Sequence, residues 1–585
     1  MVNLTINDIP VSVPEGTTIM KAAASVGVDI PHLCYLEGIN EIGACRVCCV
    51  QVKGERAMVP ACNSTVREGM VVYTNSPKAR RTRRINVELI LSQHDCRCAT
   101  CVRSGNCQLQ RIANDLGILD IPYAQDLPEG KRRLWTTTYP LYRDYNKCIK
   151  CMRCIQICDK VQTVSIWDLA GTGSRTHIDV SYNRMIKESE CALCGQCITH
   201  CPVGALRERD DTTKFLQALG DKEKVVIVQI APAVRAAWGE ELGLKPEEAT
   251  VNRIAAVLKR MGVDYVFDTS FTADLTIMEE GTELLHRLKK GDLVRYPMFT
   301  SCCPGWVRFL KSQYPELTGR LSTAKSPQQM FGSVIKQYFA EKAEIDPNKI
   351  YSVSIMPCLA KKSECDLPTM KSEYGQDVDL VLTTRELNRL IRADKIDPAK
   401  LEEVPFDNPL ADYTGAGVIF GATGGVMEAA LRSAYFLTQG RNPDPDAFSE
   451  IRSMDGWREY TFMLGETPLR CAVATGLGNT RKLIEAILDG RVKYDFVEVM
   501  ACPGGCVGGG GQPISIEDEE RAPARSKILY SLDKNSKLRF SHENEQVQYL
   551  YKDWLGEPYS EKAEEYLHTD HYGWEMPQAV KIEQE

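Results

Sequence analysis

Two cysteine runs with the same spacing constrain this chain more than any other feature of its sequence. Residues 148–158 read CIKCMRCIQIC and residues 191–201 read CALCGQCITHC, so each run is C-x2-C-x2-C-x3-C. This spacing is typical of chains that wrap two [4Fe–4S] clusters, in which the fourth cysteine of each run binds the cluster of the other run. We therefore expect one cluster on Cys148, Cys151, Cys154 and Cys201, and a second on Cys191, Cys194, Cys197 and Cys158.

The remaining cysteines and the overall charge narrow the function classes. Of 24 cysteines in 585 residues, 17 lie in the first 201. The first residues, MVNLTINDIPVSVPEG, lack the basic and apolar regions of a secretory signal, so we expect a cytoplasmic protein whose clustered cysteines bind metal. The sequence contains no run of 18 apolar residues, so we expect no membrane span. The net charge of −7 and the pI near 5.8 argue against nucleic acid as a partner.

The first 78 residues contain a separate set of four cysteines. β-Branched stretches within residues 2–13 and 47–59 predict strands, and residues 17–24 predict a short helix opened by a hydroxyl cap. Four thiolates satisfy a [2Fe–2S] centre, although ten residues separate the first two cysteines, unlike the plant-type spacing. We expect the ligands to be Cys34, Cys45, Cys48 and Cys62, with Cys49 pointing away.

Residues 94–107 read HDCRCATCVRSGNC and supply one histidine and three cysteines at H-x3-C-x2-C-x5-C spacing. Taken alone, this pattern fits structural zinc as well as iron. The iron–sulfur patterns on both sides favour a [4Fe–4S] cluster. Its expected ligands are His94, Cys98, Cys101 and Cys107, with Cys96 as the non-ligand.

From residue 222 the composition changes to alternating helical and strand-like segments, which indicates α/β layering. The apolar run 225–230 is typical of a buried parallel strand. Cys303, Cys358, Cys502 and Cys506 could supply thiolates for one more cluster, and Gly504, Gly505 and Gly508 to Gly511 would let backbone pass close to an inorganic group. By spacing alone, these thiols could equally be buried apolar side chains.

The motifs around these four cysteines resemble a known family. TSCCPGW at 300–306, MPCLAKKSE at 356–364 and MACPGGC at 500–506 are similar to the three signatures of the [FeFe]-hydrogenases, over nearly the whole chain. The N-terminal modules also resemble the electron-input arm of respiratory complex I. The resemblance implies a multidomain α/β and α+β chain, with ferredoxin-like iron–sulfur modules followed by an α/β catalytic domain. The domains are expected at 1–78 ([2Fe–2S]), 79–137 (His/Cys3 [4Fe–4S]), 138–210 (two [4Fe–4S]), 222–515 (catalytic) and 516–585 (a helical wrap similar to a small subunit).

The resemblance also assigns roles at the catalytic centre. It implies that Cys303, Cys358, Cys502 and Cys506 hold a cubane joined to a di-iron unit with CO, cyanide and dithiolate ligands, the H-cluster. Cys506 would be the bridging thiolate, and maturation enzymes would install the di-iron unit. Lys361 would hydrogen-bond a cyanide ligand, which would be the anionic partner of its buried ammonium. The pocket wall would include Gln328, Met356, Met500 and the backbone near Ala231 and Pro232.

A proton path follows from the same resemblance. Cys302, next to a ligand, matches the thiol that passes protons. Residues 275–288 predict a helix with Glu280 and Glu283 on one face, and Arg287 lies four residues beyond Glu283, a spacing that favours an ion pair. By pattern alone this is a solvated acidic face. With the resemblance, Glu280, Glu283, Ser322 and Arg287 match the family's proton carriers.

No complete dinucleotide-binding or P-loop glycine motif occurs, which predicts no NAD(P) or flavin site in this chain. We expect a reversible hydrogenase, the hydrogen-converting subunit of an NAD(P)-linked complex with flavin- and nicotinamide-binding partners, of which a bifurcating complex is one form. Ferredoxin is a further candidate partner. The alternatives are an electron-transfer subunit, a hydrogen sensor and a scaffold for iron–sulfur assembly.

Overall fold

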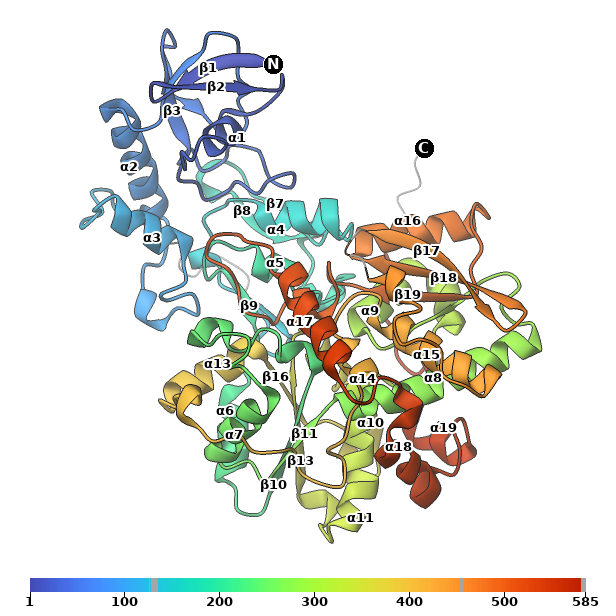
Figure 1. Cartoon of the computed structure of the whole chain (residues 1–585). Coiled ribbons are helices and arrows are strands. Elements are labelled where there is room, and N and C mark those ends of the chain that lie inside the picture. The colour runs from blue at the N-terminus through green and yellow to red at the C-terminus, as the bar shows by residue number, and fades with distance from the viewer. Residues whose placement is uncertain (126, 128–134, 453, 455, 580–585) are drawn as a thin grey trace.

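The computed structural model describes residues 1–125, 127, 135–452, 454 and 456–579. In this part of the chain, no helix combines the length and the apolar character that crossing a membrane would require. Iron–sulfur modules lie at one end of the molecule, and a larger body with two sheets forms the rest (Figure 1).

The N-terminal module is a five-stranded sheet with one short helix. Its strands are β1 (Val2–Ile6), β2 (Ile9–Val13), β3 (Cys49–Val52), β4 (Val59–Pro60) and β5 (Val71–Tyr73), in the order β2-β1-β5-β3-β4. The helix α1 (Ile19–Ala24) begins at Thr18, whose hydroxyl accepts a hydrogen bond from the Lys21 backbone N–H. This is the hydroxyl cap that the sequence predicts. The strands fall within the expected stretches, except that β5 lies beyond them.

Helices α2 (Pro77–Ser92) and α3 (Gln108–Asp115) connect this module to the one that carries the two cysteine runs. That module has the short strand pairs β6 (Leu141–Arg143) with β9 (Leu206–Glu208) and β7 (Trp167–Ala170) with β8 (His177–Val180), and the one-turn helices α4 (Arg153–Gln156) and α5 (Gln196–Thr199). The backbone repeats in the two runs. Lys150 and Leu193 have φ near +55°, and Met152 and Gly195 have φ of 64° and 72°. Equal spacing therefore produces equal local structure.

The catalytic region contains two four-stranded sheets. One is entirely parallel, in the order β11 (Tyr265–Asp268), β10 (Val225–Ile230), β13 (Ile350–Met356) and β16 (Leu380–Thr383). The other has the order β12 (Met298–Phe299), β19 (Phe496–Met500), β18 (Thr467–Thr475) and β17 (Trp457–Leu464), and only β17 is antiparallel to its neighbour. The α/β layering is as expected, but the alternation of segments did not indicate that the strands divide between two sheets.

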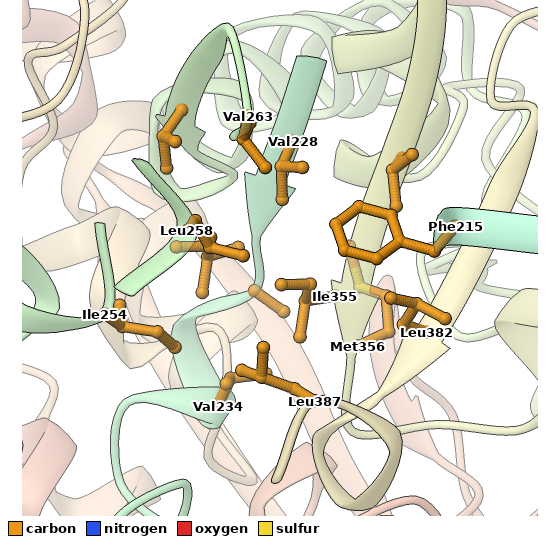
Figure 2. Packing of buried hydrophobic residues seen from close by; sticks show 14 of the residues in the cluster. Phe215, Val228, Val234, Ile254, Leu258, Val263, Ile355, Met356, Leu382 and Leu387 are labelled. Atoms are coloured by element: carbon orange, nitrogen blue, oxygen red, sulfur yellow. The ribbon is translucent and has the colours of Figure 1, made fainter. Parts of the chain in front are cut away.

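The helices of the catalytic region cover the two sheets (Figure 1). They are α6 (Thr212–Gly220), α7 (Val251–Met261), α8 (Ser270–Lys290), α9 (Pro304–Gln313), α10 (Pro327–Val334), α11 (Ala340–Lys342), α12 (Ala360–Glu364), α13 (Thr384–Ala393), α14 (Gly415–Ile419), α15 (Gly425–Gln439) and α16 (Leu477–Leu488). Figure 2 shows the core of the parallel sheet, where Phe215 of α6 and Leu258 of α7 lie near Val228 and Ile355 of the central strands. The register pairs Val228 with Val353, two residues before Ile355 in the same strand.

The glycine-rich segment at 415–425 serves helix packing. A Cβ atom on Gly417 would overlap the Ser270 carbonyl oxygen of α8, and one on Gly415 would overlap Asp533. Only glycine lets α14 approach both neighbours this closely. Close helix packing therefore explains the glycines of this segment, whose sequence does not complete a nucleotide-binding motif.

The C-terminal segment wraps around the catalytic region, as the sequence predicts (Figure 1). It contains α17 (Ala522–Asn535), α18 (Glu545–Leu550) and α19 (Glu561–Leu567). Leu529 of α17 and Leu567 of α19 are fully buried. Asp533 accepts hydrogen bonds from the buried Arg432 of α15, at 2.9 and 3.0 Å. The wrap is therefore anchored in the core by apolar contacts and by a buried ion pair.

Candidate active site

The cysteines of the catalytic region lie where parallel strands end. Cys358 is the second residue after β13, Cys502 is the second after β19, and Cys303 is the fourth after β12. Cys506 lies on the same loop as Cys502. Because ligands of open α/β sheets bind beyond the carboxyl ends of the strands, these positions form a natural binding site. The two sheets thus contribute cysteines from distant parts of the sequence to one place.

These loops enclose a cavity of about 70 Å³. Its lining includes ten residues expected at the site: Ala231, Pro232, Cys302, Cys303, Gln328, Met356, Cys358, Lys361, Met500 and Cys506. Cys502 does not line the cavity but is buried beside the other three cysteines. The sequence did not point to Thr269, Phe420 or Gly421, which also line it. Most of the wall is apolar, so the site excludes bulk water.

The four cysteines fit a metal cluster by their chemistry. Burial raises the pKa of all four thiols, that of Cys358 to about 12, and their mutual proximity adds to the effect. Four thiols in a dry pocket become thiolates only when cations replace their protons, and soft thiolate ligands favour iron–sulfur clusters or zinc. The donor set is therefore suited to a thiolate-bound cluster.

Lys361 has a partner within the protein. Its ammonium donates to Glu364 Oε2 at 2.9 Å and to the Cys302 carbonyl oxygen at 3.1 Å. Burial alone would lower the pKa of Lys361, but Glu364 raises it above its ordinary value. Glu364 also accepts from Ser326 Oγ at 2.9 Å and from Gln328 Nε2 at 3.2 Å. The expected anionic partner was a cyanide ligand, and the structure shows that a carboxylate three residues along the chain already neutralises the lysine.

A line of polar groups leads from the cavity to the surface. Arg287 donates to Glu283 Oε1 at 2.6 Å, the ion pair that the helical spacing predicts, and Ser322 Oγ donates to Glu283 Oε2 at 2.7 Å. Glu280 is fully buried between this pair and Cys302, and burial, with a smaller effect of Glu283, raises the pKa of Glu280 to about 8. The side chain of Arg287 is 16% exposed. The helix face is therefore a buried one and not the solvated surface that the pattern alone suggests.

Two histidines of the C-terminal segment reach the same region, which the sequence did not indicate. His571 Nε2 lies 2.7 Å from the Ser322 carbonyl oxygen. His568 bridges Thr323 Oγ1 at 2.8 Å and Glu279 Oε2 at 3.0 Å. The wrap thus covers the outer side of the polar line and fixes the backbone that carries Ser322.

The glycines after Cys502 lie in close contact with other parts of the backbone. Cβ atoms on Gly509 and Gly511 would overlap the Pro357 backbone, and one on Gly510 would overlap the Gly195 backbone. A Cβ atom on Gly508 would overlap the Pro503 carbonyl oxygen. These glycines let protein backbones approach each other closely. The contact of Gly510 with Gly195 joins the catalytic loop to the second cysteine run.

The two cysteine runs form the crossed sets that their spacing predicts. One cavity is lined by Cys148, Cys151, Cys154 and Cys201, three from the first run and the last from the second. In the other set, burial raises the pKa of Cys158 most, and Cys194 and Cys191 are the thiols that add most to this effect. The side chains are thus gathered as two groups of four.

The N-terminal sets are also gathered. Cys34 receives hydrogen bonds from Cys45 and Cys62, which lower the pKa of Cys34, and Cys48 interacts with Cys62. Cys49 is not among the thiols that hydrogen-bond in this group. His94 is buried, which lowers its pKa to about 4, and its Nδ1 has no hydrogen-bond partner among the described residues. A neutral buried imidazole with a free nitrogen is suited to bind a metal. Cys96 instead contacts the Leu91 and His94 carbonyl oxygens.

Short contacts connect these sets. Asn40 Nδ2 donates to the Cys34 carbonyl oxygen at 2.6 Å and to the Cys151 carbonyl oxygen at 2.9 Å. Cys502 Sγ lies 3.5 Å from the Cys194 carbonyl oxygen. The module with the two cysteine runs is therefore packed directly against the cysteine loop of the N-terminal sheet on one side and against the catalytic loop on the other.

Comparison with known proteins agrees with this arrangement. The family model for the iron only hydrogenase large subunit, C-terminal domain, matches residues 224–510. The chain is 45% identical to the NADP-reducing hydrogenase subunit HndD of Solidesulfovibrio fructosivorans, over 98% of this chain and 99% of that protein. The chain belongs to the iron-only hydrogenase family. It is also 37% identical to iron hydrogenase 1 of Clostridium pasteurianum, over 97% and 99% of the two chains.

The other parts of this hydrogenase match models of their own. They are a 2Fe-2S iron-sulfur cluster binding domain at 1–77, an NADH-ubiquinone oxidoreductase-G iron-sulfur binding region at 83–122, a 4Fe-4S dicluster domain at 147–205 and an iron hydrogenase small subunit at 519–574. The structure of the apo [FeFe]-hydrogenase HydA1 variant from Chlamydomonas reinhardtii superposes with a TM-score of 0.56 at 43% identity, and covers 63% of this chain and all of that one. The chain therefore carries iron–sulfur modules in addition to the hydrogenase domain.

Proposed function

We propose that this chain catalyses the reversible reaction 2H⁺ + 2e⁻ ⇌ H₂ at the cavity between its two sheets. One observation carries the proposal: the buried line of polar groups ends at Cys302, in the same cavity that Cys303, Cys358 and Cys506 enclose. A redox centre supplied with protons from one side and electrons from the other is what hydrogen chemistry requires.

Cys303, Cys358, Cys502 and Cys506 would hold the cubane of the H-cluster, and Cys506 would bridge to its di-iron unit. When bound, this group supplies the metal site at which two electrons and two protons combine. The protein encloses the group in an apolar pocket with Met356 and Met500 on its wall and holds the Lys361 ammonium at its edge. Maturation enzymes would install the di-iron unit, because the chain offers it one thiolate only.

Protons would move between Arg287 at the surface and Cys302 through Glu283, Ser322 and Glu280. A carboxyl group with a pKa near 8 exchanges protons readily at neutral pH, because both of its forms are populated there. Glu283, held by Arg287 and Ser322, would pass protons to it from the surface.

Electrons would travel through one [2Fe–2S] cluster and three accessory [4Fe–4S] clusters. The ligands proposed are the four cysteines of the N-terminal sheet, the His94 set and the two crossed sets. Support comes from the contacts of Asn40 with Cys34 and Cys151, and of Cys502 with Cys194, because they place successive sites side by side. A cytoplasmic location fits this use of cysteine.

We infer that flavin- and NADP-binding subunits complete the enzyme. The relative HndD is named as a subunit of an NADP-reducing hydrogenase. This chain lacks a complete nucleotide fingerprint, and residues 83–122 match a region of NADH-ubiquinone oxidoreductase. Ferredoxin is a second candidate partner.

The alternatives each leave part of the structure unused. An electron-transfer subunit has no need of the four buried cysteines at the strand ends, and an assembly scaffold has no need of Glu280 and Glu283. A hydrogen sensor would tend to alter the proton path, and here Cys302, Glu280, Ser322, Glu283 and Arg287 are all in place.

The matured full-length chain, alone and in its native complex, provides the test. We expect hydrogen-dependent reduction of a viologen dye by the chain alone, and hydrogen-dependent reduction of NADP⁺ only when flavin-containing subunits co-elute with it in gel filtration. A matured chain that does not oxidise H₂ with any dye would contradict the catalytic proposal. Native activity eluting only near 65 kDa without flavin would contradict the partner proposal.

A further inference from the structure

Two buried arginines near the first crossed cysteine set have no carboxylate partner among the residues that the structure describes. Arg143 is 2% exposed, and its Nε and one terminal nitrogen make no hydrogen bond within the part of the chain that is described. Arg103 is 6% exposed, and the same holds for its Nε and one terminal nitrogen. A guanidinium is always charged, and its burial is unfavourable unless an anion is close by.

Both arginines face the same cysteine set. Arg143 lines the cavity formed by Cys148, Cys151, Cys154 and Cys201, and its ring contacts with Tyr145 and Trp167, at 4.7 and 5.1 Å, hold the guanidinium there. Arg103 lies close enough to Cys201 of this set and to Cys107 of the His94 set for its charge to act on both thiols.

The acidic groups in the neighbourhood are engaged elsewhere. Asp179, near Arg143, accepts from Tyr145 OH at 2.8 Å and lies 3.5 Å from His177. Glu241, a carboxylate whose charge acts on the Arg103 guanidinium, forms an ion pair with Arg392 at 3.4 Å. The Arg143 guanidinium therefore lies against the space that the cysteines enclose, and the Arg103 guanidinium lies near Cys201 of the same set.

Other arginines near the two crossed sets are arranged differently. Arg153, close to Cys151, is neutralised by Asp518 through two hydrogen bonds of 2.8 and 2.9 Å. Beside the second set, Arg308 donates to the Cys191 carbonyl, Ser363 Oγ and Tyr139 OH, at 3.0 to 3.3 Å, and is only partly buried. Among the described residues, Arg143 and Arg103 are thus deeply buried at the first set without a carboxylate partner, whereas Arg308 at the second set is partly exposed and donates three hydrogen bonds.

We propose that Arg143 and Arg103 raise the reduction potential of the cluster on Cys148, Cys151, Cys154 and Cys201, so that this cluster holds an electron at the junction of the relay. The inference rests on the proposed function, because it requires the cluster. Reduction adds one electron and one negative charge to the cluster, with no proton and no bond change, and a nearby cation stabilises the more negative form.

The proposed cluster lies where two routes for electrons meet, so an electron stored on it can wait for a second one. The N-terminal sheet reaches the set through Asn40, which bonds the carbonyl oxygens of Cys34 and Cys151. The His94 set reaches it through Arg103. Electrons arriving singly by either route would meet here, before the second set and the cavity where they are used in pairs.

The test uses the full chain, produced without maturation enzymes and reconstituted with iron and sulfide, in a redox titration followed by electron paramagnetic resonance. In each of the variants Arg143→Gln and Arg103→Gln, we expect the midpoint potential of one [4Fe–4S] cluster to fall. At a fixed potential, the ratio of reduced to oxidised cluster should be tenfold lower, which corresponds to a shift of about 59 mV for one electron. Arg143→Lys, which keeps the charge, should have a midpoint potential close to that of the wild type. Arg80→Gln, an exposed arginine on α2, should leave all midpoints in place.

The outcomes separate the inference from the function it rests on. Iron and sulfide analysis that finds fewer clusters in the wild-type chain than the four accessory sites require would contradict the cluster assignment itself. Full cluster content with unchanged midpoints in both glutamine variants would overturn the inference alone. If the Arg143→Gln variant loses its cluster, the midpoint potential of the Arg103→Gln variant decides the inference: a fall supports it, and an unchanged midpoint at full cluster content overturns it.

Discussion

Replacing Glu280 with glutamine is the sharpest perturbation of the proposed proton path. Glu280 is fully buried, neither of its carboxyl oxygens has a hydrogen bond of ordinary geometry within the described residues, and it lies between Cys302 and Glu283. Glutamine has nearly the same size but cannot exchange a proton. We therefore expect a loss of turnover of about 10²- to 10⁴-fold, the range typical of a lost general acid–base group.

The pH dependence follows from the pKa of Glu280, which burial raises from 4.5 to about 8. Below pH 8 the carboxyl is mostly protonated and can deliver a proton to Cys302. Above pH 8 it is mostly ionised and can accept one. Hydrogen production should therefore decline as the pH rises through about 8, whereas hydrogen oxidation should increase over the same interval. Both inflections should disappear in Glu280→Gln.

The assay is dye-linked turnover in both directions between pH 6 and 9, with the infrared spectrum of the matured protein as a check that the metal site is intact. Glu279→Gln is the matched control, because Glu279 is equally buried in the same helix but bonds His568 and the Tyr559 backbone. The control should keep turnover within a few-fold of the wild type. Turnover of Glu280→Gln within threefold of the wild type, with an unchanged pH profile, would refute the reasoning.

Three further predictions concern the cavity and its support. Cys302→Ala should keep the infrared bands of the metal site but lose most turnover, and unchanged turnover would remove Cys302 from the proton path. Glu364→Gln leaves the Lys361 ammonium buried without its carboxylate and should destabilise the protein by about 3–5 kcal/mol, seen as a lower temperature of thermal unfolding, and an unchanged temperature would contradict the role of this pair. Gly417→Ala should cost about 1–3 kcal/mol because its Cβ overlaps the Ser270 carbonyl oxygen; calorimetry showing no loss would mean that α14 can move.

The sequence reveals those parts of the site in which spacing is local. The repeated runs predict crossed sets, and the structure gathers Cys148, Cys151, Cys154 and Cys201 around one cavity. The i, i+4 spacing of Glu283 and Arg287 predicts an ion pair, which is present. The ion pair is decided within one helical turn, whereas the crossed sets join cysteines of two separate runs, and it is the repetition of one spacing that indicates this pairing. The roles of these residues as ligands and proton carriers stay predictions.

The parts that the sequence missed, or that local spacing left open, depend on distant contacts. Cys303, Cys358 and Cys502 come together because three strands of two sheets end near one another, and no periodicity indicates which sheet a strand joins. Arg143 reaches its cavity from a short strand, with no motif around it. Likewise, nothing in the C-terminal segment singles out His571. The exception is Glu364, whose i, i+3 relation to Lys361 could have been recognised as an ion pair.

The central claim is that four cysteines from the ends of distant strands hold an iron centre that combines protons and electrons. Infrared spectroscopy of the matured full-length chain tests it most directly, with Cys471→Ser, a buried cysteine outside the site, as the control. The account predicts carbon monoxide and cyanide bands that respond to H₂ in the wild type and in the control, and their loss in Cys506→Ser. Absence of these bands from a matured wild-type chain, or zinc in place of iron in its metal content, would contradict it.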